Sequence, residues 1–148
     1  MNGYLLDTSI CVYLFRGNRD VMQRLNRIGF EHCFICDVVL AELRYGAYNS
    51  NFVEDNLKMI DDFIEEVQVL PFANSIDVYA KEKVRLKKAG MPIEDFDLLI
   101  GCAAKAAKLF HAIYIAVQLT EHHYAVSIID DFGFLRTGEV DGEGKAGR

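Results

Sequence analysis

Residues 4–9 read YLLDTS: a short apolar segment, an aspartate, and then two small residues with hydroxyl groups. The apolar residues are typical of a buried strand, and the following residues, TSICVYLFRG, are typical of a helix that ends at Gly17. In open parallel sheets, ligands gather just beyond the carboxyl ends of the strands, which is where Asp7 would lie. Asp7 is therefore a candidate functional residue, with the alternative that Asp7 or Thr8 only caps the helix.

The same alternation of strand and helix continues along the chain. Short apolar segments are followed by segments with helical spacing of apolar residues, and Asp37 is expected to cap one of these helices. The pattern predicts an α/β fold with a mainly parallel central sheet flanked by helices. The expected strands are 3–6, 33–35 and 68–70, and the expected helices are 8–17, 19–28, 37–48, 51–66, 75–89 and 95–109.

The composition is that of one globular domain. The chain has 148 residues, of which 51% are hydrophobic, and a net charge of −6. This charge argues against binding nucleic acid through a bulk positive potential, leaves a local basic groove open, and suits a basic protein partner. We expect a domain over residues 1–135, followed by a disordered tail over residues 136–148, which are rich in glycine and polar residues.

The cysteines are expected to be reduced thiols in a cytoplasmic protein. The first apolar segment is far too short for a secretory signal, and charged residues interrupt the apolar stretch 98–119, which argues against a membrane span. Cys33 and Cys36 form a C-x-x-C pair. Zinc would need a second pair of ligands at a matching spacing, so packed thiols are the favoured interpretation.

Two further acids lie in apolar helical sequence. Glu42 is surrounded by valine, leucine and alanine in DVVLAELRYG, so its carboxylate must be exposed, paired or coordinated. Arg44 is two residues on and points away from it on a helix, which weakens pairing. Asp97 lies in the first turn of the helix that begins EDFDLLIG, where a helix-start acid is the alternative. Asp95 diverges from it by about 200° on a regular helix and is an accessory candidate.

The positions of these carboxylates predict a metal site. Three carboxylates that converge from separate strand or helix ends repel one another, and their pKa values rise. A hard divalent cation such as Mg²⁺ or Mn²⁺ relieves this repulsion, because it prefers oxygen ligands, waters and a substrate phosphate. Asp7, Glu42 and Asp97 therefore predict a metal site at the carboxyl edge of the sheet and metal-assisted hydrolysis of a phosphodiester.

Four segments in order, YLLDTS, VLAELRYG, VLPF and PIEDFDLLIG, resemble the PIN-domain nucleases, specifically the VapC-type toxins of bacterial toxin–antitoxin pairs. The resemblance covers about residues 1–105. It implies a PIN-like fold and an Mg²⁺- or Mn²⁺-dependent ribonuclease that forms a homodimer and is held inactive by a VapB-type antitoxin. It matches the three acids above with the core acids of the family, and Thr8 and Ser9 with its small polar pair, in which Ser9 replaces a common Asn.

The resemblance ends after about Lys105, where the family continues with a strand and a polar group that helps complete the site. Here the candidates for a fourth acid are Glu121, Asp130 and Asp131, the last two directly after the strand-like segment AVSII. The alternative is that this third of the chain has diverged, which would leave a PIN fold that only binds antitoxin or RNA.

Two other segments have both a structural and a functional interpretation. Residues 81–88, KEKVRLKK, contain five basic residues and one acid, which is typical of a solvated helix face and also suits contact with RNA phosphates. The apolar and aromatic residues of 45–64 are expected to lie mostly in the core, and part of them to cover an antitoxin helix. They are Tyr45, Tyr48, Phe52, Ile60, Phe63 and Ile64.

Overall fold

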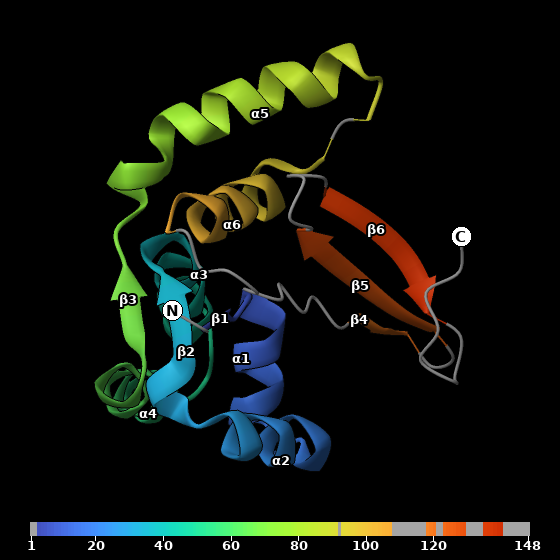
Figure 1. The fold of residues 1–148 in the computed structure, drawn as a ribbon. Helices are drawn as coiled ribbons and strands as arrows, with labels where there is room; N and C mark the ends of the chain where they lie inside the picture. Colours follow the sequence, from blue (N-terminus) through green and yellow to red (C-terminus); the bar gives the residue numbers. More distant parts are fainter. Residues whose placement is uncertain (1–2, 92, 108–117, 121–122, 130–134, 141–148) are drawn as a thin grey trace.

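Three short parallel strands form the sheet of the N-terminal part of the molecule (Figure 1). The computed structural model describes residues 3–91, 93–107, 118–120, 123–129 and 135–140. The strands are β1 (Tyr4–Leu5), β2 (Cys33–Cys36) and β3 (Gln68–Leu70), in the order β1-β2-β3. Because all three run in the same direction, their carboxyl ends lie along one edge of the sheet.

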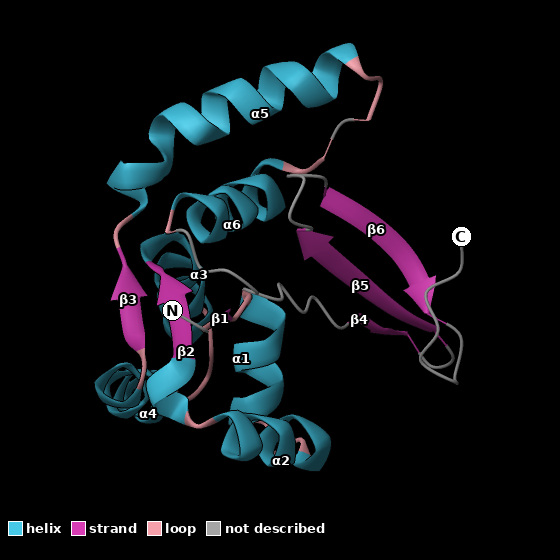
Figure 2. Cartoon of the chain, viewed as in Figure 1, coloured by secondary structure: helices cyan, strands magenta, loops and turns pink. Residues whose placement is uncertain are grey.

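A pair of helices follows each strand, so the first 107 residues consist of three consecutive β-α-α units (Figure 2). Short 3-10 turns, η1 (Phe30–His32) and η2 (Phe72–Ser75), precede β2 and the helix that begins at Ile76. The expected α/β fold is confirmed, and the predicted elements agree with the observed ones to within a few residues at their ends. The helices are α1 (Thr8–Phe15), α2 (Arg19–Ile28), α3 (Asp37–Tyr48), α4 (Val53–Glu66), α5 (Ile76–Lys88) and α6 (Asp95–Ala106).

A second sheet lies in the C-terminal part of the chain and is antiparallel. Its strands are β4 (Gln118–Thr120), β5 (His123–Ile129) and β6 (Leu135–Val140). The assignment of residues 136–140 to a tail is therefore wrong, because their backbone pairs with β5, which contains the β-branched segment AVSII. Residues 141–148 of the predicted tail lie outside the described residues.

One hydrophobic core joins the parallel sheet to the helices. Leu5 of β1 and Ile35 of β2 are fully buried and belong to the same cluster as Val39 of α3 and Ile100 of α6. A smaller cluster of Leu86, Leu98 and Cys102 joins α5 to α6. The first turn of α6 is thus packed against α5 directly after Asp97.

The four cysteines are free and buried, and Cys33 and Cys36 lie at the two ends of β2. Side chains alternate along a strand, so these two point to opposite faces of the sheet. In the described part of the chain, no helix has both the length and the apolar character needed to cross a membrane.

The aromatic residues at the end of α3 are exposed. The buried stripe of α3 is Val39, Leu43 and Ala47, spaced four residues apart. Tyr45 and Tyr48 therefore lie on other faces of the helix. The expectation that Tyr45, Tyr48 and Phe52 belong to the core is therefore wrong: they are 71%, 67% and 69% exposed. Ile60 and Phe63 of α4 are buried, as predicted, and Ile64 is partly buried against the core.

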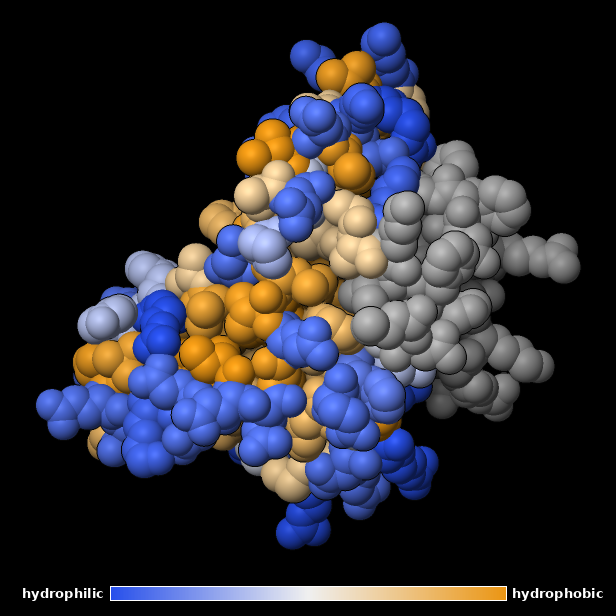
Figure 3. Space-filling model, turned by 60° about the vertical axis from the view of Figure 1, so that its left-hand side comes forward, coloured by the Kyte–Doolittle hydropathy of each residue, from blue (hydrophilic) through white to orange (hydrophobic). Residues whose placement is uncertain are grey.

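The surface around β3 also carries apolar side chains. The side of the molecule with β3 and the start of α5 comes forward in Figure 3, where apolar side chains gather in the middle of the face between hydrophilic ones. β3 is the edge strand of the described parallel sheet, and its Val69 is 37% exposed.

Candidate active site

Asp7 lies directly beyond the carboxyl end of β1 and is only 4% exposed. Its backbone is extended, and its Oδ1 atom accepts a hydrogen bond from the backbone N–H of Ile10 at 2.8 Å. Asp7 is therefore the N-cap of α1, and the capping alternative describes its geometry correctly. Capping does not require burial, however, because an exposed aspartate caps a helix equally well. The burial of this carboxylate needs a further explanation.

The charge of Asp7 is coupled to two acids from other elements. Burial raises the pKa of Asp7 from 3.8 to about 7, and the hydrogen bond from Ile10 opposes this shift. The carboxylates of Asp97 on α6 and Glu42 on α3 raise the pKa further. The fold thus brings the three predicted acids, one from each β-α-α unit, within electrostatic reach of one another.

Glu42 lies in the second turn of α3 and is half-buried. The hydroxyl of Thr8 donates a hydrogen bond to its Oε2 atom, which joins the first residue of α1 to α3. Arg44 turns away, as predicted, and donates from Nη2 to Oδ1 of Asp61 on α4 at 2.6 Å. Because Thr8 follows Asp7 directly, this hydrogen bond holds the carboxylate of Glu42 close to Asp7. Ser9 is also half-buried in the first turn of α1.

The two acids in the first turn of α6 have different environments. Asp97 is exposed, and its charge raises the pKa of Asp7. The Oδ1 atom of Asp95 instead accepts hydrogen bonds from Lys83 and Tyr79 of α5. This difference supports the choice of Asp97 over Asp95 as the third acid of the site.

Asp37 is an acid at the same sheet edge that sequence reasoning treated only as a cap. That assignment is wrong: Cys36 occupies the N-cap position of α3, and Oδ1 of Asp37 accepts a hydrogen bond from the backbone N–H of Phe72 at 3.0 Å. Asp37 therefore ties the end of β2 to η2. Its signal in the sequence, an acid directly after a strand, was the same as that of Asp7. The fourth-acid candidates Glu121, Asp130 and Asp131 lie outside the described residues.

The chemistry of the donor set fits a hard divalent cation. Asp7, Glu42 and Asp97 offer carboxylate oxygens, which Mg²⁺ and Mn²⁺ prefer. Burial raises the pKa of Asp7, and repulsion from Asp97 and Glu42 adds to this effect, so a bound cation would stabilise the charged carboxylates. Within the described ranges, no three acidic, histidine or cysteine side chains are already arranged to hold a metal ion. Binding an ion between these three acids would therefore require their side chains to move closer together.

The raised pKa of Asp7 predicts that the metal-free protein loses stability as the pH rises from about 4 to 7. The carboxyl group has a pKa of 3.8 when unfolded and of about 7 in the fold, so in this interval the folded state binds more protons. The free energy of unfolding therefore falls with pH there, by up to roughly 4 kcal/mol, and is unaffected by this group below and above the interval. Urea unfolding of the protein in chelator between pH 4 and 8 measures this.

The matched control is Asp7→Asn, which keeps a capping side chain but does not titrate. The difference in unfolding free energy between the two proteins isolates the contribution of Asp7 from that of the other acids. A difference that stays constant across the pH range would contradict the assignment of a raised pKa to this residue.

Comparison with known proteins defines the class to which this fold and site belong. Residues 4–111 match the model of the PIN domain. The chain therefore belongs to the PIN-domain family. The matched region contains the parallel sheet and all three acids, and the antiparallel sheet lies beyond it.

Within that family the chain is similar to VapC proteins. It is 32% identical to Ribonuclease VapC2 of Rickettsia felis in an alignment of 111 positions that covers 70% of this chain and 79% of that protein. It is 31% identical to the tRNA(fMet)-specific endonuclease VapC of Shigella flexneri over 108 residues, which are 72% of this chain and 81% of that protein.

Solved structures similar to this chain include VapBC complexes. The structure of VapBC2 from Rickettsia felis bound to a DNA fragment from their promoter matches with a TM-score of 0.65 and 32% identity, covering 70% of this chain and 81% of that chain. DNA-bound VapBC from Salmonella typhimurium matches with a TM-score of 0.66 and 26% identity, covering 72% of this chain and 82% of that chain.

Proposed function

We propose that this chain is a metal-dependent endoribonuclease, the toxin of a toxin–antitoxin pair, that hydrolyses phosphodiesters of RNA with Mg²⁺ or Mn²⁺. The observation that carries the proposal is the buried Asp7, whose pKa is raised to about 7 by burial and by Asp97 and Glu42 from two other helices. The similarity to relatives named as ribonuclease and tRNA endonuclease VapC supports the same reaction class.

In this proposal, Asp7, Glu42 and Asp97 hold the divalent ion, and each residue has a defined task. A divalent ion bound there would supply a water molecule of lowered pKa and would offset charge on the scissile phosphate. Asp7 must give up its proton before it becomes a ligand, so metal binding and deprotonation are linked. Thr8 orients Glu42 through their hydrogen bond. Hydrolysis leaves a 5′-phosphate and a 3′-hydroxyl, as the family resemblance implies.

The partner in this proposal is a VapB-type antitoxin, and the toxin is a homodimer in the cytoplasm. The similar solved structures named VapBC support such a pairing. The net charge of −6 suits a basic partner, and an acidic site favours an inserted Arg or Lys side chain. The exposed aromatic residues Tyr45, Tyr48 and Phe52 are available to contact a partner.

Cleavage of RNA in the presence and absence of divalent metal tests the proposed activity. We expect the purified chain to cleave RNA internally with Mg²⁺ or Mn²⁺. Three carboxylates cannot by themselves offset the charge of the scissile phosphate, whereas a divalent cation held by them can. Excess chelator should lower the rate by at least about 10²-fold, comparable to the loss of an electrostatic catalytic group. Rates are read from end-labelled RNA, and the new ends are identified by phosphatase and ligase treatment.

Adding Mn²⁺ back after chelation is the control, and it should restore the rate and raise the melting temperature of the protein. Cleavage that persists in chelator, or products with 2′,3′-cyclic phosphate ends, would reject the proposal. So would the absence of cleavage with every metal, since the chain would then be a PIN fold that only binds.

A further inference from the structure

Three side chains tie the first turn of α6 to α5. The ammonium group of Lys83 donates to Oδ1 of Asp95 at 2.7 Å and to the hydroxyl of Tyr79 at 3.0 Å. The same hydroxyl donates to Oδ1 of Asp95 at 3.1 Å, so each group contacts the other two. The ammonium group also lies 5.4 Å from the centre of the Tyr79 ring. These contacts hold the pKa of Asp95 below its usual range, chiefly through the hydrogen bond from Lys83.

Tyr79 is itself held in place. Its ring packs edge-to-face on Phe72 of η2, with the ring centres 6.2 Å apart, and it contacts the small apolar cluster of Leu86, Leu98 and Cys102. Leu98 is the residue after Asp97. The residues on both sides of Asp97, Asp95 through polar contacts and Leu98 through packing, are therefore fixed against α5.

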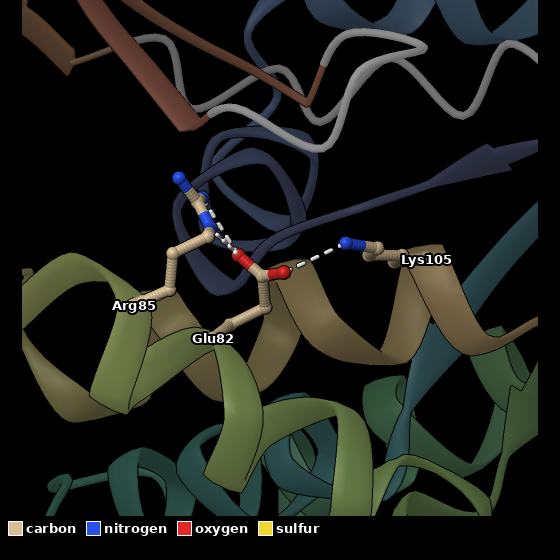
Figure 4. A network of polar contacts seen from close by, with 3 residues as sticks. All are labelled: Glu82, Arg85 and Lys105. Carbon is tan, nitrogen blue, oxygen red and sulfur yellow. Dashed lines mark hydrogen bonds and ion pairs between the residues drawn. The ribbon is translucent and has the colours of Figure 1, made fainter.

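A second contact fixes the other end of α6 to α5 (Figure 4). Glu82 accepts hydrogen bonds from Nε and Nη2 of Arg85 on its own helix, at 2.8 and 2.7 Å, and from Nζ of Lys105 in the last turn of α6, at 2.8 Å. The adjacent residues Glu82 and Lys83 thus bind opposite ends of α6. This arrangement restrains both rotation and sliding of α6 along α5.

We propose that Lys83, Tyr79 and Asp95 are positioning residues that fix the carboxylate of Asp97 for metal binding; this inference rests on the proposed function. Side chains project outward from the axis of a helix, so a small rotation of the first turn of α6 moves the carboxylate of Asp97. Displacements of about 1 Å are enough to weaken a metal or catalytic site. An exposed ion pair contributes little to global stability, so the effect should be seen in metal affinity rather than in unfolding.

Lys83→Met separates positioning from simple electrostatics. If the lysine acted only through its charge, its removal would make the acidic site more negative, and Mn²⁺ would bind more tightly. If it positions α6, its removal frees the first turn and Mn²⁺ binds more weakly. Tyr79→Phe gives a second test, because it removes the hydroxyl without changing any charge.

The experiment is a titration of Mn²⁺ with the purified full chain at pH 8, in which free Mn²⁺ is measured by electron paramagnetic resonance. We expect Lys83→Met and Tyr79→Phe to raise the dissociation constant of Mn²⁺ by roughly tenfold, the lower end of the effect for residues that orient metal ligands. Lys83→Arg should retain most of the affinity. With saturating Mn²⁺, kcat for RNA should fall while KM stays unchanged.

The matched control is Lys58→Met, which breaks the exposed pair of Lys58 with Asp62 on α4, also 2.7 Å long. It should leave the affinity for Mn²⁺ unchanged. If Lys83→Met binds Mn²⁺ as tightly as wild type, or more tightly, while Asp97→Asn binds it weakly, the positioning role is wrong and the proposed site stands. If wild type itself binds no Mn²⁺, both proposals fall.

Discussion

Replacing Asp7 with Asn is expected to lower the rate of RNA cleavage by at least about 10²-fold while the protein stays folded. The amide keeps the shape of the side chain and its ability to cap α1, since Asn is as good an N-cap as Asp. It removes the ligand charge at the position where the fold buries a carboxylate, 4% exposed, beside two other acids. The loss should therefore appear in kcat and in metal affinity.

The measurement is cleavage of one labelled RNA by wild type and Asp7→Asn at matched, saturating Mn²⁺, with thermal melting as the test of folding. At pH 8 in chelator, the variant should melt no lower than wild type, because it no longer buries a charged group among like charges. Equal cleavage rates would remove Asp7 from the proposed mechanism. A lower rate that accompanies a collapse of the melting temperature would show that Asp7 acts mainly as a cap.

Glu42→Gln is expected to lower cleavage by a similar factor, about 10²-fold, for a related reason. The amide still offers an oxygen to the Thr8 hydroxyl, so α1 and α3 stay joined while the ligand charge is lost. Thr8→Val, which removes the orienting hydroxyl but leaves the charge, should lower the rate by only about tenfold. The rate of single-turnover cleavage at a fixed Mn²⁺ concentration distinguishes the larger loss in Glu42→Gln from the smaller loss in Thr8→Val.

The combination of Asp7→Asn and Glu42→Gln supplies the control for a shared site. Residues that act as one unit give effects that are far from additive, so the double variant should be little slower than either single variant. If the two losses multiply to about 10⁴-fold, Asp7 and Glu42 act at independent steps and do not hold one ion.

The regular elements of this fold could be predicted because they follow from local patterns. Helix α3, with apolar residues four apart, and β2, an apolar segment before a helix, were found with nearly correct bounds. The face that each helix buries was harder to predict. Tyr45 and Tyr48 lie outside the buried stripe of α3, and their exposure depends on which side α4 and the sheet occupy, which is a tertiary property.

The three acids of the candidate site could be selected from the sequence, but the contacts that support them could not. Asp7 and Glu42 stood out because carboxylates are costly in apolar sequence. Asp95 and Asp97 share a turn, and only the position of α5 shows that Lys83 and Tyr79 bind the first of them. The basic segment 81–88 reads as a solvated face or an RNA contact, yet Lys83 and Arg85 form contacts within the fold. Strand β6 was missed because its sequence, LRTGEV, contains glycine and charged residues, which are depleted in strands, and only its pairing with β5 identifies it as a strand.

The order of the three β-α-α units has a consequence for the synthesis of this protein in a cell. Each unit contributes one acid to the proposed site, and the third acid, Asp97, follows the other two by more than fifty residues. A ribosome produces the chain from its N-terminus, and domains of proteins begin to fold as they emerge. A nascent chain with only the first two units has Asp7 and Glu42 but lacks the residue that completes the site. A ribosome that makes a nuclease of this design therefore carries no complete site on its nascent chain until translation of the domain is nearly finished.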